Sequence, residues 1–540
     1  MRRQFLATLF LVGIGALGYI TYTLYWTVQE QQMVVEQLKN SIGSTYRTDV
    51  PQGPAINPII YRWNELQPKL QDTVVQIFPN IAQFNWLEPY KSPNQLLATG
   101  SGFFIDDQGH IITNAHVVDQ ARSLTIQIPS FGKRRFEVNI IGVSPDRDLA
   151  LLKLTDEDKK ALESSLGTIR YLPLSNSDQV HRAEEIMALG YPLSQQSLKS
   201  TTGVVSGQEH IEGHFMLQIS APINPGSSGG PCLNMKGEVV GVSRAGIYGG
   251  AQNVGYIIPS NEVSLFLKQL EAAPAINGVK LLRKPFIGVF YCNATPALVE
   301  YLGNPQPGGL YVVETYKGGP LQKAGVLPGD MIYEINGRKI DNFGEMEGWN
   351  KEDRINVVDF VARLTIGEKV NMVIYRKGVK KNISFTFNQC EVAAIRAMNP
   401  MLEHIDYEIV GGMVVMQLAL NHLPILLQVA PELSKFMDFR NQMEPRLVVT
   451  HIFPDSMVFK SRTFGPGTIL KEVNGKEVKT LSDFRNAVAL SGKDDFLTLK
   501  TSENLFTVLP WQRVLSDESK LAKNYLYSIT PFMREFLTTK

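Results

Sequence analysis

Cysteine is almost absent from this sequence, and neither sign of charge dominates it. Three cysteines in 540 residues exclude a small fold stapled by disulfides. The 53 Lys and Arg are balanced by 52 Asp and Glu, so the formal net charge is +1 and offers no broad positive field for a nucleic-acid backbone. Hydrophobic residues make up 44% of the chain, enough for the cores of about three to four domains. We therefore expect a multidomain globular protein with no nucleic-acid partner.

A long apolar segment lies close to the N-terminus. Arg2 and Arg3 precede an uncharged run that extends from Phe5 to Trp26. As a helix rising about 1.5 Å per residue, this run spans roughly 33 Å, the thickness of a bilayer core. It ends in tyrosine and tryptophan, as at a membrane interface, where a cleaved signal peptide has small residues. Residues 1–27 are therefore predicted to form a membrane anchor, followed by a stalk or linker over 28–58.

The first arginines predict the side of the membrane on which the chain folds. Positive residues stay in the cytoplasm, so everything after Trp26 is expected to cross. This favours a single-pass protein of the bacterial inner membrane whose folded part faces the periplasm. A cleaved signal peptide is the alternative and leads to the same compartment, whereas an organellar address would call for an Arg-rich and Ser-rich leader.

Short apolar runs rich in Val and Ile characterise residues 59–277. Clusters of Gly, Pro, Asn and Asp separate them, a pattern typical of an all-β barrel or sandwich domain. Strands are predicted at residues 73–78, 102–105, 124–128, 149–154 and 238–242, and a helix at 261–273. The chain is therefore expected to be mainly β.

Two later regions share an internal similarity. Each has an apolar strand, a Pro/Gly turn, a second strand and an Asn-Gly hairpin signal, at residues 308–337 in the earlier copy and 445–475 in the later one. We expect one small β-rich module to occur twice, over 281–392 and 400–540. Repeated modules of this kind suggest recognition.

A glycine-rich turn carries a candidate nucleophile. Residues 224–231 read Asn-Pro-Gly-Ser-Ser-Gly-Gly-Pro. Missing side chains let consecutive N–H groups converge on one point, where they can hold an oxyanion. Ser228 is therefore the candidate nucleophile, with the backbone of Gly226 and Ser228 as the main donors and that of Ser227 as a third.

Two upstream residues supply the remaining groups of a serine hydrolase. An apolar strand leads to His116, and Asp148 stands at the head of another strand. A histidine can take the proton of a serine, and a carboxylate can fix the tautomer of that histidine. The chain order His, Asp, Ser is that of chymotrypsin-like enzymes and agrees with the barrel interpretation.

Several motifs together resemble the HtrA/Deg family of trypsin-like serine proteases with PDZ domains, namely residues 100–102, 113–116, 148–153, 190–192, 203–206, 224–231 and 253–259. The resemblance implies His116 as general base, Asp148 as the residue that orients it and Ser228 as nucleophile. It also implies two six-stranded barrels in a chymotrypsin-like domain, a homotrimer or a multiple of trimers, and ATP-independent cleavage of unfolded or damaged proteins. The absence of a G-x-x-x-x-G-K-[ST] run agrees with ATP independence, and no cofactor is expected.

The resemblance extends to the repeated modules. Phe286, Ile287, Gly288 and Val289 look like the carboxylate-binding loop of a PDZ domain, an α+β fold in which backbone N–H groups hold a peptide C-terminus. A plain first strand is the alternative. The tail is similar to the divergent second PDZ domain of plant-type organellar Deg proteases through residues 407–412, 445–449 and 494–497. Such a module serves assembly there, so we interpret it as architectural.

Two positions depart from the family pattern. Ser227 stands where the family usually has Asn, and residues 220–222 read Ser-Ala-Pro where it usually has Asp-Ala-Ala. Both changes leave the triad intact. Ala245, Gly246 and Ile247 lie near the expected specificity pocket without an acid, which favours a small apolar side chain in the substrate.

Other histidines and cysteines have simpler interpretations. His210 and His214 have a spacing that could bind a metal on a helix, but their surroundings indicate a hairpin, so no metal site is expected. Cys292 and Cys390 are expected to be free thiols, with a disulfide as the alternative. Cys232 is predicted to be a buried core residue.

The sequence as a whole predicts a membrane-anchored serine endopeptidase of protein quality control, with unfolded proteins as substrates and peptide C-termini bound at the first PDZ domain. One alternative is a chaperone or scaffold whose protease domain rests in an inactive conformation. The other is a regulatory protease with a single target.

Overall fold

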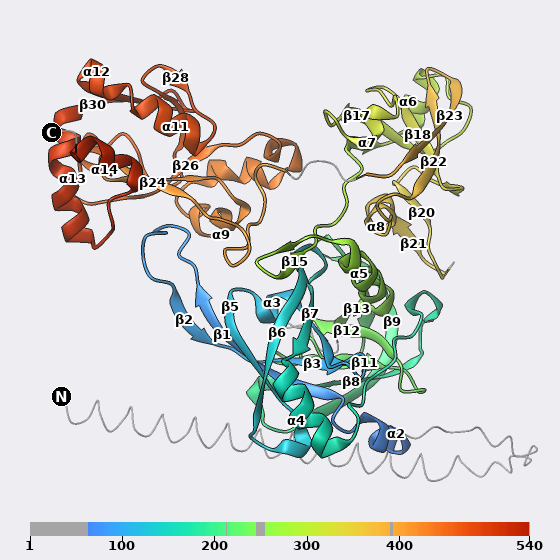
Figure 1. Cartoon of the computed structure of the whole chain (residues 1–540). Helices are drawn as coiled ribbons and strands as arrows, with labels where there is room; N and C mark the ends of the chain where they lie inside the picture. The colour runs from blue at the N-terminus through green and yellow to red at the C-terminus, as the bar shows by residue number, and fades with distance from the viewer. Residues whose placement is uncertain (1–62, 212, 245–253, 351, 389–392, 539–540) are drawn as a thin grey trace, which may run out of the picture. The chain divides into compact units, whose positions relative to one another are not determined.

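The structure, a computed structural model, describes residues 63–538 apart from 212, 245–253, 351 and 389–392 (Figure 1). All described residues belong to one compact unit, residues 61–540. The predicted anchor and stalk lie outside the described residues. Within those residues, no helix combines the length and the apolar character needed to cross a membrane.

Six strands close into a barrel, called the first barrel here. In ring order they are β1 (Val74–Gln83), β3 (Gly100–Phe104), β4 (His110–Thr113), β7 (Leu149–Leu154), β6 (Arg135–Ser144) and β5 (Ala121–Gln127). Their inward side chains, among them Ile77, Phe104 and Leu152, are fully buried in one apolar core, which drives the closure. The sheet is extended by β2 (Asn94–Leu97), β14 (Ala275–Ile276) and β15 (Val279–Leu281). The helices of this region are α2 (Trp63–Leu70), α3 (Ala115–Val118) and α4 (Asp156–Leu166).

A second closed barrel follows in the chain. Its ring order is β10 (His214–Ile219), β13 (Gly255–Pro259), β12 (Val239–Arg244), β11 (Pro231–Leu233), β8 (Glu185–Gly190) and β9 (Lys199–Ile211). Helix α5 (Ser260–Ala272) continues from β13. Cys232 is fully buried in this barrel, as predicted, and burial raises the pKa of its thiol. Each predicted strand overlaps a strand of the two barrels, and the predicted helix overlaps α5. The strand predicted at 149–154 has the same bounds as β7.

The first repeated module follows as a sheet with short helices. The sheet order is β16 (Val289–Asn293), β17 (Leu310–Thr315), β18 (Met331–Ile335), β22 (Lys369–Arg376) and β23 (Val379–Thr386), with β19 (Arg338–Lys339) beside β18. A separate hairpin pairs β20 (Glu345–Glu347) with β21 (Arg354–Asn356). The helices are α6 (Pro296–Tyr301), α7 (Pro320–Lys323) and α8 (Val357–Ala362).

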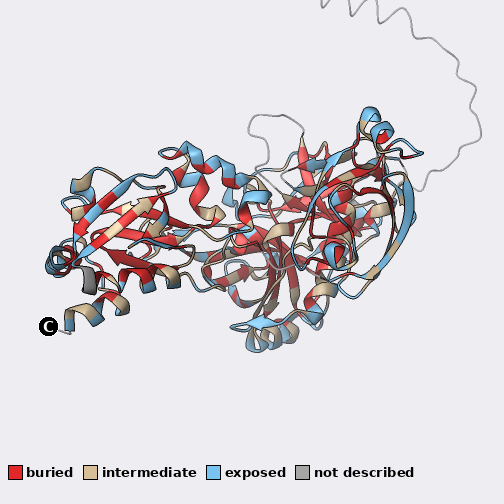
Figure 2. Cartoon of the chain, turned by 90° about the horizontal axis from the view of Figure 1, so that it is seen from above, coloured by how far each residue is buried: buried red, intermediate tan, exposed pale blue. Residues whose placement is uncertain are grey.

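The second repeated module has the same core arrangement with additions. The sheet order is β24 (Tyr407–Val410), β25 (Met413–Gln417), β26 (Leu447–Ile452), β27 (Ile469–Val473), β29 (Phe496–Thr501) and β30 (Phe506–Pro510), with β28 (Lys476–Glu477) beside β27. Its helices are α9 (Leu423–Leu426), α10 (Met457–Ser461), α11 (Leu481–Val488), α12 (Ser491–Asp494), α13 (Trp511–Tyr525) and α14 (Pro531–Thr538). Figure 2 shows buried residues gathered along the strands, and exposed residues on the outer faces of helices and in loops.

The two modules share one turn down to single hydrogen bonds. Asn336 and Asn474 both adopt a positive φ, 47° in each case, and each begins an Asn-Gly hairpin turn. The Asn336 side-chain oxygen accepts the N–H of Asn371 at 2.8 Å, and the Asn474 oxygen accepts that of Thr498 at 2.8 Å. The same turn therefore anchors the same neighbouring strand in both modules.

The two modules differ at one sheet edge. Among the described strands, β16 pairs only with β17, whereas the corresponding strand β25 pairs with both β26 and β24. Arg485 on α11 holds β24 in place through contacts of 2.8 Å with both Asp406 and Glu408. Glu408 is fully buried and also accepts a hydrogen bond from Thr530. The edge of β16 that no described strand covers in the first module therefore corresponds to the edge of β25 that β24 covers in the second.

Candidate active site

His116 and Asp148 face each other in the first barrel. His116 lies on the short helix α3, directly after β4, and Asp148 immediately precedes β7. The His116 Nδ1 atom is 3.0 Å from Oδ1 and 2.9 Å from Oδ2 of Asp148. The backbone N–H of His116 also donates to Oδ1 at 3.0 Å. One carboxylate therefore fixes both the backbone and the ring of the histidine, which directs Nε2 away from the pair.

The backbone around Asp148 is held in an unusual conformation. Asp148 ends a 3₁₀ turn over Pro145–Arg147 and has a φ of 55°, in the left-handed region. Asn114 compensates by donating a side-chain hydrogen bond to the Asp148 carbonyl at 3.0 Å. The carboxylate is almost completely buried, with 7% of the side chain exposed, whereas 47% of the His116 side chain is open. This arrangement suits a buried carboxylate that serves an accessible base.

Ser228 lies on the predicted glycine-rich turn, between β10 and β11. The turn begins with Asn224-Pro225-Gly226-Ser227, in which the Ser227 N–H donates to the Asn224 carbonyl at 2.9 Å and Gly226 has a φ of 94°. A side chain at Gly226 would also meet the Tyr191 carbonyl, because its Cβ would lie 2.5 Å from that oxygen. Glycine is therefore required there on two grounds, conformation and space.

The same turn corrects one of our predictions. The Ser227 N–H is already engaged inside the turn, so it does not serve as a third oxyanion donor in this structure. The signal was present in the sequence, because a Pro-Gly pair at the two central positions predicts a type II turn with this hydrogen bond. Gly226 and Ser228 remain the candidate donors.

Ser101 on β3 anchors the nucleophile turn to the first barrel. Its hydroxyl donates to the Gly226 carbonyl at 2.8 Å and accepts the N–H of Tyr191 at 2.9 Å. Its backbone N–H donates to the Ser228 carbonyl at 2.8 Å. Its own carbonyl accepts the Thr113 hydroxyl at 2.7 Å, next to the residues that lead to His116. Ser101 belongs to the motif at residues 100–102, but no role was predicted for it.

Arg244 also contacts the candidate triad. Its Nε atom is 3.2 Å from Oδ2 of Asp148, the oxygen that His116 also contacts. Arg244 is the last residue of β12. Nothing in the sequence around this arginine indicates that it contacts the active site. A cavity of about 440 Å³ adjoins these groups and is lined by His116, Asp148, Arg244, Arg283, Met398 and Leu402, among others.

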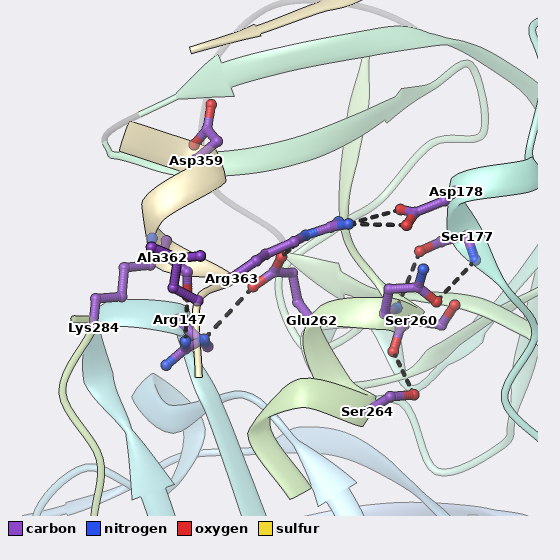
Figure 3. Close-up of polar contacts among 12 residues, drawn as sticks. Arg147, Ser177, Asp178, Ser260, Glu262, Ser264, Lys284, Asp359, Ala362 and Arg363 are labelled. Carbon is purple, nitrogen blue, oxygen red and sulfur yellow. Dashed lines mark hydrogen bonds and ion pairs between the residues drawn. The ribbon is translucent and has the colours of Figure 1, made fainter. Parts of the chain in front are cut away.

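Charged side chains gather around Arg147, the residue before Asp148 (Figure 3). The Arg147 side chain is only 1% exposed, with Nε 3.6 Å from Glu262 on α5, and its Nη2 atom donates to the Ala362 carbonyl of α8 at 2.9 Å. Arg363 donates to the same Glu262 at 2.7 Å. Burial lowers the pKa of Arg147, and the charge of Glu262 opposes that shift. The residue next to Asp148 is thus fixed to two helices outside the first barrel.

The remaining predicted residues fall into three groups. Ala245, Gly246, Ile247 and Cys390 lie outside the described residues, and Cys292 is an exposed free cysteine. His210 and His214 lie on the β9–β10 hairpin, as predicted, where His210 contacts Asp359 at 2.9 Å. Burial lowers the pKa of His214 to about 3, with Lys284 and Arg244 adding to the shift.

The predicted carboxylate-binding loop precedes the open strand edge. Gly288 has a φ of 79°, and its carbonyl accepts the Tyr316 N–H at 2.9 Å. Ile287 and Val289 are buried in the core of the module. Phe286 is half-buried and contacts Phe439, with ring centroids 4.7 Å apart. The loop therefore has its left-handed glycine at the start of β16.

Comparison with known proteins assigns two domains. A model of the trypsin-like peptidase domain matches residues 100–242, and a model of the PDZ domain matches residues 285–386. A probable periplasmic serine endoprotease DegP-like from Hahella chejuensis is 27% identical over 410 residues, covering 74% of this chain and 77% of that protein. Serine protease HTRA3 from Rattus norvegicus is 30% identical over 302 residues, covering 52% of this chain and 61% of that one.

A solved structure titled HtrA-type protease AlgW with decapeptide is 22% identical, with a TM-score of 0.47, and the match covers 61% of this chain and 99% of that one. The family models give a peptidase domain and a PDZ domain, and both relatives are named serine proteases or endoproteases. The chain thus combines a trypsin-like serine peptidase domain with a PDZ domain and is similar to proteins named DegP-like and HtrA serine proteases.

Proposed function

We propose that the chain is an endopeptidase that cleaves unfolded or damaged proteins through a triad of Ser228, His116 and Asp148. The observation that carries the proposal is the His116–Asp148 pair, with contacts of 2.9 and 3.0 Å, together with the glycine turn that carries Ser228. An exposed imidazole backed by a buried carboxylate is suited to move a proton.

The chemistry follows from the role of each group. Ser228 Oγ attacks the carbonyl carbon of a peptide bond, and His116 Nε2 takes the hydroxyl proton. The oxyanion accepts hydrogen bonds from the N–H groups of Gly226 and Ser228. His116 then gives its proton to the leaving amine, which departs and leaves an acyl ester on Ser228. A water molecule, deprotonated by His116, hydrolyses that ester and restores the serine.

The PDZ domain is the proposed receptor for peptide C-termini. Its strand β16 has an edge that no other described strand occupies, and the segment from Phe286 to Val289 leads into it. A peptide could add there as a strand, with its carboxylate at the loop. The second module is proposed to be architectural, because β24 already occupies the corresponding edge of β25.

The cellular setting is proposed from the N-terminal sequence and the relatives. The apolar run before Trp26 supports an inner-membrane anchor, and the name of the Hahella chejuensis relative supports a periplasmic site of action. Assembly as a homotrimer, or a multiple of trimers, is carried over from the family resemblance.

Labelling with a fluorophosphonate tests the proposed nucleophile. We expect the full chain to be labelled and to degrade denatured casein, whereas Ser228→Ala should lose both by at least about 10³-fold, because the Ser228 hydroxyl forms the covalent bond in both reactions. Ser227→Ala is the matched control and should keep its labelling. Labelling that persists in Ser228→Ala would contradict the triad.

The same assays separate the two alternative functions. An unlabelled wild-type chain that still suppresses casein aggregation would support a chaperone. A chain that cleaves one folded target but does not cleave casein would support a regulatory protease.

Removal of the Ser101 hydroxyl tests how the turn is supported. Ser101→Ala leaves the Tyr191 N–H and the Gly226 carbonyl without their partner, so we expect kcat/KM on casein to fall about 10-fold to 100-fold while the chain stays folded. Ser123→Ala, at an exposed site on β5, is the control. Equal kinetics for the two variants would show that Ser101 does not support the turn.

A matched pair of peptides tests the PDZ domain. We expect a fluorescent peptide with an apolar C-terminal residue and a free carboxylate to bind the full-length Ser228→Ala chain at least about tenfold more tightly than its C-terminal amide, because the loop holds a carboxylate. Fluorescence anisotropy measures both affinities, and hydrogen exchange over residues 286–293 locates the site. Equal binding of acid and amide would refute this assignment.

A further inference from the structure

Arg244 and His116 share one oxygen of Asp148. The Asp148 Oδ2 atom is 2.9 Å from His116 Nδ1 and 3.2 Å from Arg244 Nε. Only 16% of the Arg244 side chain is exposed. On the proposed function of His116 and Asp148, we infer that Arg244 is a positioning residue that orients the triad carboxylate.

The strand that carries Arg244 is fixed to the nucleophile turn. Arg244 is opposite Tyr256 in the β12–β13 ladder. The residue before it, Ser243, accepts the Gly229 N–H at 2.9 Å and donates its own N–H to the Gly230 carbonyl at 2.8 Å. One strand therefore braces the turn of Ser228 and presents a guanidinium to Asp148, so Arg244 has a defined place relative to the triad.

The shared oxygen explains how Arg244 can orient the carboxylate. Because Arg244 Nε and His116 Nδ1 contact the same Asp148 oxygen, a rotation of that carboxylate would break both contacts. The guanidinium therefore holds Asp148 in the orientation that receives the His116 ring.

Other charged or titratable groups lie near this site. Asp119 and Arg283 line the same cavity, Asp146 and Arg147 belong to the Pro145–Arg147 turn that precedes Asp148, and His214 begins β10. Two of the cations face carboxylates of their own, since Arg147 Nε is 3.6 Å from Glu262 and Arg283 is 3.6 Å from Asp146. His214 is neutral above about pH 4, because burial lowers its pKa to about 3. Asp119 is exposed to solvent, which screens its charge. Arg244 is paired with the triad carboxylate itself.

The test is the separate measurement of kcat and KM at pH 8 on the full chain with a fluorescent casein. We expect Arg244→Gln to lower kcat about tenfold and to leave KM within about twofold of the wild-type value, because a misoriented carboxylate weakens proton transfer without changing substrate binding. Arg244→Lys keeps a cation beside Asp148 and should recover most of the loss. Arg283→Gln removes a charge from the same cavity and should leave kcat unchanged.

Each outcome decides between the claims. A wild-type chain without Ser228-dependent cleavage overturns the proposed function and the inference together. An active wild type whose kcat equals that of Arg244→Gln overturns the inference alone, as does an equal loss of kcat in Arg283→Gln. If Arg244→Gln fails to fold, Arg244→Thr supplies the neutral residue, and loss of fold in both would assign Arg244 to barrel stability and overturn its positioning role.

Discussion

The tie between Ser101 and the nucleophile turn is the contact on which the proposed active site depends. Ser228 belongs to the second barrel, and His116 and Asp148 belong to the first. Ser101 joins the two through the Gly226 carbonyl, the Tyr191 N–H and the Ser228 carbonyl, at 2.8 to 2.9 Å. Because a triad tolerates little displacement of its members, a fixed connection between the barrels is a condition for the chemistry.

A second level of support comes from buried charge. Asp148 is bound by His116 on one side and by Arg244 on the other, and the neighbouring Arg147 is fixed by Glu262 and the Ala362 carbonyl. Burying such groups is costly unless each has a partner, and a change in one partner is therefore felt by the others. The turn that carries Asp148 is thus in contact both with the second barrel and with α8 of the PDZ domain.

Local signals in the sequence were enough for the elements and for the candidate triad. The strand of residues 149–154, the Asn-Gly turns at 336 and 474 and the glycine-rich turn at 224–231 each depend on neighbouring residues alone. The roles of Ser101 and Arg244 could not be predicted from neighbouring residues. Ser101 acts through contacts with residues 90 to 125 positions away in the chain, and the place of Arg244 depends on the register of two strands. The prediction that the Ser227 N–H is an oxyanion donor was wrong. The Pro225-Gly226 pair already indicated a turn that engages this N–H.

The most direct test of this account is a crystal structure of the chain with a peptide boronic acid, which mimics the tetrahedral intermediate. The account predicts a bond between boron and Ser228 Oγ, with one boronate oxygen within about 3 Å of the N–H groups of Gly226 and Ser228 and a second near His116 Nε2. A boronate bonded to another residue, or bonded to Ser228 with its oxygens directed away from Gly226, would contradict it.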